Sequence, residues 1–195
     1  MRLVLLGAPG SGKGTQAQIL QDELGVPHVS TGDLLRAAVR AGTPLGQRAK
    51  AVMEAGQLVS DEIVLGMLEE RLAQPDAAAG FILDGYPRNV AQCAALEALL
   101  ARIGQSLDIA VELKVPNERI VERIAGRAAA EGRKDDTPET VRARLEVYEQ
   151  QTAPVAAHFA AAGKLASIDG VGSLEEVSSR IFDALSARRE ARASA

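Results

Sequence analysis

The chain has 195 residues, which is the size of one domain or of one domain with small insertions. Its 47% of apolar and 25% of charged residues are typical of a globular protein in water, and its net charge of −4 argues against general nucleic-acid binding. The single cysteine, Cys93, excludes internal disulfides and a cysteine-ligated zinc site and fits a reducing compartment. No apolar run approaches a membrane span, and Met1 leads directly into the first expected strand, so we expect a cytoplasmic protein.

Short apolar runs alternate with helical patterns along the chain. The expected strands are residues 3–6, 26–29, 81–83, 109–115 and 165–168. The expected helices are residues 16–24, 34–40, 45–55, 60–72, 90–103, 116–124, 139–162 with an interruption at Pro154, and 173 to about 189, with 192–195 frayed. Residues 75–80 and 126–138 are expected as loops. This alternation predicts an α/β fold with a five-stranded parallel sheet flanked by helices, and ligands bind such sheets at the carboxyl ends of the strands.

A glycine-rich loop joins the first strand to the first helix and reads Gly-Ala-Pro-Gly-Ser-Gly-Lys-Gly-Thr over residues 7–15. Glycines let successive backbone N–H groups turn inward around an anion, the following helix adds the positive end of its dipole, and Lys13 adds a mobile charge. This setting predicts a phosphate-binding loop. Gly14 stands where the general pattern has Ser or Thr, and Thr15 comes one residue later, which leaves open whether a loop hydroxyl contacts Mg²⁺.

Two acidic residues near expected strand ends could serve a metal. Asp84 ends the 81–83 strand, where a carboxylate often lies near Mg²⁺, although an Asp before Gly also forms turns. Asp33 pairs with Ser30 in a helix-capping pattern and could also hold a metal-bound water. For Asp135 and Asp136 we favour helix-start and loop roles. For His28, His158 and Cys93 we favour structural roles.

Arginines recur near the expected strand-end loops and beside the 126–138 segment. Six of them are candidates for binding phosphate: Arg36, Arg88, Arg123, Arg127, Arg133 and Arg144. Guanidinium groups bind phosphate oxygens bidentately and keep their charge. The sequence offers no convincing Ser-His-Asp or Cys-His set. A phosphate acceptor is already ionised near neutral pH and needs no general base, so the pattern points to phosphoryl transfer between phosphates.

Several motifs together resemble the adenylate kinase family of P-loop NTPase-type nucleoside monophosphate (NMP) kinases. They are the residue 7–16 loop, the segment Ser-Thr-Gly-Asp-Leu-Leu-Arg at 30–36, residues 56–64, the segment Asp-Gly-Tyr-Pro-Arg-Asn at 84–89 with Gln92, and residues 133–136. They occur in family order over nearly the whole chain. The resemblance implies one kinase domain over residues 1–195 with a core (1–29, 60–125, 137–195), an NMP-binding helical insertion (30–59) and a short lid (126–136).

The resemblance also implies an activity and residue roles. The activity is reversible, Mg²⁺-dependent transfer of the terminal phosphoryl group of ATP to AMP, giving two ADP, by a monomer. The implied catalytic residues are Lys13, Arg88, Arg123, Arg133 and Arg144. ATP would be bound by Gly10, Ser11, Gly12, Lys13, Gly14, Thr15, Arg123, Arg127 and Gly172. AMP would be bound by Thr31, Arg36, Gln57, Leu58, Val59, Gly85, Tyr86, Pro87, Arg88, Gln92, Arg133 and Arg144, with a cis Tyr86–Pro87 peptide. Asp84 and Asp33 would hold Mg²⁺ through water.

The lid departs from the long form of the family, because only residues 128–132 separate Arg127 from Arg133. We therefore expect no zinc in the lid. The nearest alternative is a uridylate/cytidylate kinase of the same fold, but Thr31, residues 58–61 and Gln92 favour adenylate. An ATP-sensing module without activity is the alternative from another class, and it would be expected to lack some of the six arginines.

Overall fold

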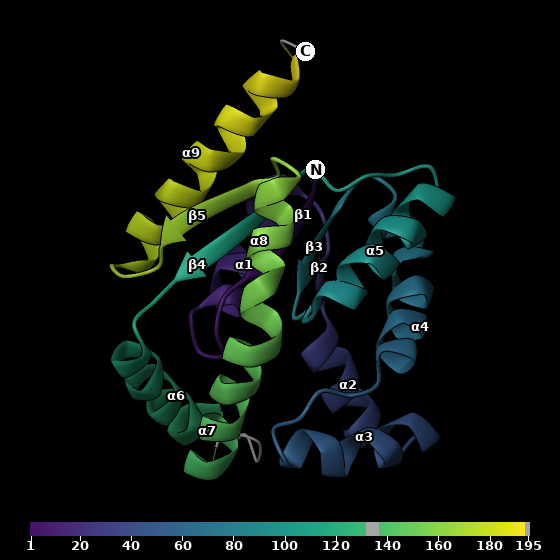
Figure 1. Ribbon diagram of the computed structural model, residues 1–195, viewed down its shortest axis with the longest axis vertical. Coiled ribbons are helices and arrows are strands. Elements are labelled where there is room, and N and C mark those ends of the chain that lie inside the picture. The colour runs from purple at the N-terminus through teal and green to yellow at the C-terminus, as the bar shows by residue number, and fades with distance from the viewer. Residues whose placement is uncertain (132–136, 194–195) are drawn as a thin grey trace.

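The computed structural model describes residues 1–131 and 137–193, and for residues 125 and 127–131 it describes the backbone alone. At its centre lies a parallel five-stranded sheet with the order β2-β3-β1-β4-β5, seen in Figure 1. The strands are β1 (Arg2–Leu6), β2 (His28–Ser30), β3 (Phe81–Asp84), β4 (Ile109–Lys114) and β5 (Leu165–Asp169). All five expected strands are confirmed, although β2 begins two residues later than its apolar run.

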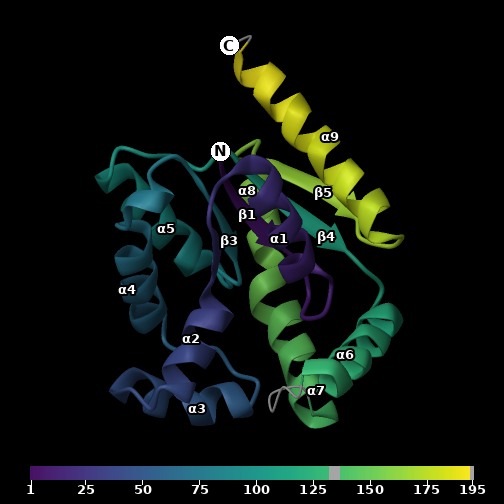
Figure 2. The same cartoon turned by 180° about the vertical axis from the view of Figure 1, so that it is seen from behind.

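Helices connect the strands and cover both faces of the sheet (Figures 1 and 2). They are α1 (Lys13–Leu24), α2 (Thr31–Arg40), α3 (Pro44–Glu54), α4 (Asp61–Leu72), α5 (Val90–Arg102), α6 (Asn117–Glu131), α7 (Pro138–Val147), α8 (Ala153–Ala161) and α9 (Leu174–Ala193), with a 3-10 turn η1 (Pro75–Ala77) and a π-helical segment η2 (Tyr148–Thr152). Among the described residues, no helix is long and apolar enough to cross a membrane.

The alternation of side chains along β1 divides the core into two layers. Leu3 and Leu5 face α1 and α9, where they meet Leu20 and Ile181. Val4 and Leu6 face the other side, where α4, α5 and α8 contribute the buried residues Leu68, Leu96 and Phe159. Because both faces of the sheet are buried, β1 is held between the two layers and its alignment with the neighbouring strands is fixed. The loop that follows β1 is therefore anchored at the centre of the sheet's carboxyl edge.

Three expectations about helices need correction, and a fourth is confirmed. Residues 126–131 continue α6 instead of forming a loop, because the run Ala128-Ala129-Ala130 favours helix strongly enough to outweigh Gly126. The interruption expected in the 139–162 helix is confirmed, because η2 separates α7 from α8 immediately before Pro154. The run Ser60-Asp61-Glu62 is the pattern of an N-cap and predicts that Ser60 caps α4, but its side chain makes no capping bond to the described residues. The last helix includes Arg192, which pairs with the buried carboxylate of Asp108 instead of fraying.

Other local expectations are confirmed. Ser30 caps α2 by accepting a hydrogen bond from the Asp33 N–H at 3.2 Å. Ser173 and Glu176 form the reciprocal capping box expected at the start of the last helix. The Tyr86–Pro87 peptide bond is cis. Beyond the carboxyl end of the sheet, α2 and α3 lie on one side and α6 and α7 on the other (Figures 1 and 2).

Candidate active site

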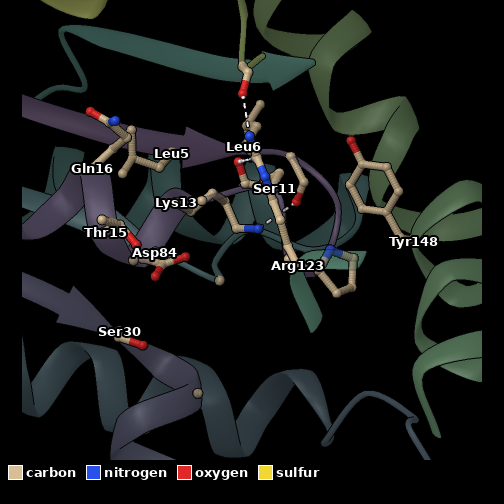
Figure 3. A pocket seen from close by; sticks show the side chains of 18 of the residues that line it. Leu5, Leu6, Ser11, Lys13, Thr15, Gln16, Ser30, Asp84, Arg123 and Tyr148 are labelled. Carbon is tan, nitrogen blue, oxygen red and sulfur yellow. Dashed lines mark hydrogen bonds between the residues drawn. The ribbon is translucent and has the colours of Figure 1, made fainter. Parts of the chain in front are cut away.

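A cavity of about 1010 Å³ opens at the carboxyl end of the sheet, between α2 on one side and α6 and α7 on the other. Its lining comes from the loop after β1, the start of α1, the ends of β2 and β3, and residues of α2, α6, α7 and η2 (Figure 3). This volume is at the upper end of the range for small-molecule sites. The strand-end placement expected from the sequence is therefore confirmed for a large cavity.

The loop that carries Lys13 is shaped to expose backbone N–H groups. Gly12 immediately precedes α1 and has φ of 100°, a left-handed conformation that glycine adopts without strain. No side chain among the described residues caps α1. The first N–H groups of the helix thus face the cavity with the positive end of the helix dipole, which is an arrangement suited to an anion.

Lys13 lies folded over this loop. Its Nζ donates hydrogen bonds to the carbonyl oxygens of Gly7 at 2.7 Å and Ala8 at 2.9 Å. Ser11 lies beneath it with a buried hydroxyl that has no hydrogen-bond partner among the described residues. Thr15 also lines the cavity, in the first turn of α1.

Arg123 joins three segments at the cavity wall. From α6, its guanidinium donates hydrogen bonds to the carbonyl oxygens of Ser11 and Gly170, each at 3.1 Å. Figure 3 shows Arg123 beside Ser11 of the glycine-rich loop. Ile120 and Ile124 of the same helix are buried against Ala8. Helix α6 is therefore packed directly on the glycine-rich loop, and a positive charge is fixed beside it.

Arg88 provides a second fixed cation. Its Nε donates to the carbonyl oxygen of Gly85 at 2.7 Å, and its own carbonyl oxygen accepts from Thr152 Oγ1 at 2.7 Å. Burial, helped by the nearby charges of Arg144 and Arg36 and opposed by Asp84, lowers the pKa of Arg88 to about 10. The guanidinium still carries its charge at neutral pH. Arg144 and Arg36 line the same cavity, and Arg36 also pairs with Asp33 at 2.6 Å.

Asp84, the last residue of β3, forms a pair with His28, the first residue of β2. His28 Nε2 lies 3.3 Å from Asp84 Oδ2, and both residues line the cavity. Burial alone would raise the pKa of Asp84, but the hydrogen bond to His28 and the charges of Lys13 and Arg88 outweigh it, so the pKa is lowered. A Cβ built on Gly14 would lie 3.8 Å from Asp84 Oδ2, which places a carboxylate beside the start of α1.

A smaller cavity of about 50 Å³ lies between α2, the connector after α3 and the start of α5. Its lining includes most of the expected base-reading residues: Thr31, Gln57, Leu58, Val59 and Gln92. Arg36, Arg88 and Arg144 line this cavity as well as the large one. The three arginines thus stand where the two cavities meet.

Several expected site residues lie elsewhere or outside the described part of the chain. Tyr86 is 1% exposed and belongs to the hydrophobic core on one face of the sheet, so it lines neither cavity. The Arg127 side chain and all of Arg133, together with Asp135 and Asp136, are outside the described residues. The other expected residues that line a cavity are Gly10, Ser11, Gly12, Gly14, Thr15, Asp33, Gly85, Pro87 and Gly172.

The sequence interpretation missed three cavity residues. His28 was expected to be structural only, Tyr148 was not considered, and Thr152 lies in a π-helical segment that no pattern predicted. Burial raises the pKa of Tyr148, with Glu112 adding to the shift. Among the described residues, no group of three or more His, Cys, Asp or Glu side chains could hold a metal ion.

Comparison with known proteins identifies close relatives. The family model described as adenylate kinase matches residues 5–164. A curated adenylate kinase of Stenotrophomonas maltophilia strain K279a is 64% identical over 187 residues, which cover 96% of this chain and 100% of the relative. The adenylate kinase of Xanthomonas campestris pv. campestris strain B100 is 66% identical over 185 residues, covering 95% and 99%. That of Xanthomonas axonopodis pv. citri strain 306 is also 66% identical over 185 residues, with the same coverage.

Proposed function

Since the chain belongs to the adenylate kinase family and is an ATP:AMP phosphotransferase, we propose that it forms two ADP reversibly by bringing the two phosphate tails together among fixed cations. The convergence of Lys13, Arg36, Arg88, Arg123 and Arg144 on one cavity carries this proposal. Two polyanions repel each other, and guanidinium groups held in place lower that repulsion without having to reorganise during the reaction. Positioning and charge neutralisation are what phosphoryl transfer mainly requires.

The reaction needs no general base. A bond forms between an oxygen of the AMP phosphate and the γ-phosphorus of ATP. The bond between that phosphorus and the β–γ bridging oxygen breaks, and its electron pair stays on the oxygen, which becomes a terminal oxygen of ADP. The attacking oxygen is already ionised near neutral pH, so no side chain has to remove a proton.

We assign the ATP phosphates to the loop at the start of α1. The N–H groups from Gly10 to Thr15 would hold them, and Lys13 would turn from its carbonyl partners toward the transferred group. Arg123, held by the carbonyl oxygens of Ser11 and Gly170, would contact ATP from α6 together with Arg127. Gly172 lines the cavity after β5, where the ATP base would approach the backbone.

We assign AMP to the smaller cavity. Thr31, Gln92 and the backbone of residues 57–59 would surround the adenine. Its phosphate would point toward Arg36, Arg88 and Arg144, which stand where the two cavities meet. Arg133 would join them from the lid. Gly85 and Pro87 would lie alongside the nucleotide, whereas Tyr86 would support that loop from the core.

The residues at the loop suit a magnesium ion. Asp84 offers carboxylate oxygens, which Mg²⁺ prefers, beside Gly14 at the start of α1. Asp33 also lines the cavity, although its Oδ1 is engaged with Arg36. Magnesium bound with ATP would neutralise charge on the phosphate oxygens. Because Mg²⁺ keeps several waters, Asp84 would hold it through water while His28 fixes the carboxylate.

The two excursions would close over the substrates. Residues 30–59 form the proposed NMP-binding insertion, residues 126–136 the proposed short lid, and residues 1–29, 60–125 and 137–195 the core. Closure would exclude water and so protect the transferring group from hydrolysis. We further propose that the enzyme works as a cytoplasmic monomer in adenine nucleotide homeostasis, on the basis of the family and of the single cysteine.

One assay tests the assignment of the acceptor. Purified protein, ATP and Mg²⁺ are supplied with AMP, CMP or UMP, and ADP formation is followed with coupled enzymes. We expect AMP to be used far more efficiently than the other two. Preference for CMP or UMP would reassign the protein to pyrimidine monophosphates, and ATP binding without any transfer would make it a nucleotide sensor.

A further inference from the structure

The side-chain amide of Gln92 is held between a hydrogen-bond donor and a hydrogen-bond acceptor. Its Oε1 accepts a hydrogen bond from the Arg88 backbone N–H at 2.6 Å, and its Nε2 donates to Asp61 Oδ1 at 2.7 Å. Gln92 is 2% exposed and lines the smaller cavity. One N–H and one oxygen lone pair of the amide remain for a ligand.

These partners allow the amide only one orientation. A backbone N–H can only donate, and a carboxylate can only accept. Rotating the amide by 180° would place oxygen against the carboxylate and N–H against N–H, so both hydrogen bonds would be lost. The orientation therefore follows from the chemistry of Arg88 N and Asp61, although the two ends of an amide have nearly the same shape.

Asp61 is itself held in place. It is the first residue of α4, and it also accepts from Asn89 Nδ2 at 3.1 Å through Oδ1 and at 3.2 Å through Oδ2. Asn89 caps α5 by accepting from the Gln92 N–H at 2.8 Å. The start of α4 and the start of α5 are thus tied together around the Gln92 side chain.

The orientation of this amide decides which purine edge it matches. Adenine presents a donor, the 6-amino group, beside an acceptor, N1. Hypoxanthine presents an acceptor, O6, beside a donor, N1–H. An amide that can turn over could pair with either base, whereas a fixed amide can pair with only one of them, and the unmatched base leaves buried polar groups unpaired.

We propose that Asp61 is a specificity-determining residue that fixes the Gln92 amide for a 6-amino purine and against a 6-oxo purine. This inference rests on the proposed function, in which Gln92 faces the adenine of AMP. Asp61 contacts Gln92 and Asn89, so it acts through Gln92 as a positioning residue.

The test compares AMP with inosine monophosphate, which differs only at the edge that Gln92 would read. Asp61→Asn keeps the size of the side chain but gives it an amide that can itself turn, and Asp61→Ala removes the partner. The matched control is Glu62→Gln, which removes the neighbouring exposed carboxylate in the same first turn of α4. For each protein, kcat/KM is measured with both acceptors, and both dissociation constants are measured by calorimetry.

We expect the efficiency ratio of inosine monophosphate to AMP to rise about ten-fold in Asp61→Asn and at least as much in Asp61→Ala, the factor that one hydrogen bond to a charged group supplies. Glu62→Gln should keep the wild-type ratio. Equal losses with both acceptors, or an unchanged ratio of dissociation constants, would show a merely structural role and overturn the inference. Equal use of AMP and inosine monophosphate by the wild-type protein would also overturn the inference, whereas preference for CMP or UMP over AMP would overturn the proposed function, so the two failures can be told apart.

Discussion

His28 and Asp84, which are 56 residues apart in the chain, meet across the neighbouring parallel strands β2 and β3, with His28 Nε2 3.3 Å from Asp84 Oδ2. Strand β2 pairs with β3 so that His28 lies opposite Ile82 and Ser30 opposite Asp84. The imidazole therefore reaches along the strand to the carboxylate that we assign to magnesium. A residue that hydrogen-bonds to a metal-binding carboxylate, without contacting the metal itself, holds that carboxylate in its orientation.

Removing this imidazole should weaken the use of magnesium. We expect His28→Ala to raise the Mg²⁺ concentration needed for half-maximal ADP formation, and to lower turnover, by roughly ten-fold. The control is His158→Ala, which removes a half-buried histidine of α8 that pairs with Glu97 of α5 at 3.0 Å and lines neither cavity. Equal Mg²⁺ requirements in wild type and His28→Ala would mean that Asp84 needs no such support.

Loss of the loop lysine should affect turnover more than folding. Lys13 lines the cavity at the start of α1 and is not part of the hydrophobic core, so Lys13→Ala should leave the fold intact. We expect ADP formation to fall by roughly 10² to 10³-fold, because one fixed charge in the transition state is lost. Circular dichroism and thermal melting check the fold, and Lys50→Ala, an exposed change on α3, should keep its activity.

Arg88→Ala should affect both the binding of AMP and the reaction. The guanidinium lines both cavities, so its removal takes a positive charge from the place where the phosphates would meet. We expect KM for AMP to rise and kcat to fall, with kcat/KM lower by at least about 10²-fold. Arg102→Ala removes an exposed arginine paired with Glu69 and should change little. Steady-state kinetics with AMP varied separates the two effects, and a near-normal kcat would contradict a role in transfer.

Local sequence patterns were enough to predict the sheet and the phosphate-binding loop. Apolar runs bounded by glycine or acidic residues locate the strands, and the strand-loop-helix order around Lys13 is readable without knowledge of the rest of the fold. The cavity residues Arg36, Arg88, Arg123 and Arg144 could be proposed because each follows a strand-end loop or lies near the lid. Their roles stay predictions until they are tested in solution.

The contacts that the sequence did not predict depend on tertiary order. Neighbouring placement of His28 and Asp84 requires the strand order β2-β3-β1, which no short pattern encodes. The hydrogen bond from Thr152 to the Arg88 carbonyl depends on the π-helical register of η2, which shifts the helix face before Pro154. Helix α6 was predicted too short because charged residues after Gly126 obscured the helical preference of three consecutive alanines.

The single cysteine should be chemically inert in the folded protein. Cys93 is 0% exposed, and burial, with help from Glu97, raises the pKa of its thiol to about 11. At pH 8 the thiolate is then roughly one part in a thousand, so reaction with a disulfide reagent should be at least about 10²-fold slower than in urea. Above pH 9.0 only the unfolded chain gains this charge, so the thiol's contribution to folding stability should fall as pH rises toward about 11. Rapid labelling of the native protein at pH 8 would contradict the buried position.

A glycine in the connector should be needed for more than its backbone conformation. Gly56 has φ of 72°, and a Cβ at this position would lie 2.9 Å from the Thr140 carbonyl oxygen on α7. Gly25, after α1, has φ of 63° but nothing within 4 Å of the same position, so Gly25→Ala isolates the cost of the conformation. That cost should be about 1 kcal/mol in the free energy of unfolding.

We expect Gly56→Ala to cost about 1–3 kcal/mol more than Gly25→Ala, because the backbone of the connector or of α7 must move to admit the methyl group. Gly56 lines both cavities and lies next to Gln57, Leu58 and Val59 of the proposed adenine site, so this movement should raise KM for AMP more than KM for ATP. Urea unfolding of both variants gives the difference in stability, and kinetics with each nucleotide varied in turn gives the difference in binding. Equal stability of the two variants would mean that α7 can withdraw from the connector without loss, and the close packing of Gly56 against Thr140 would then have no role in holding the insertion.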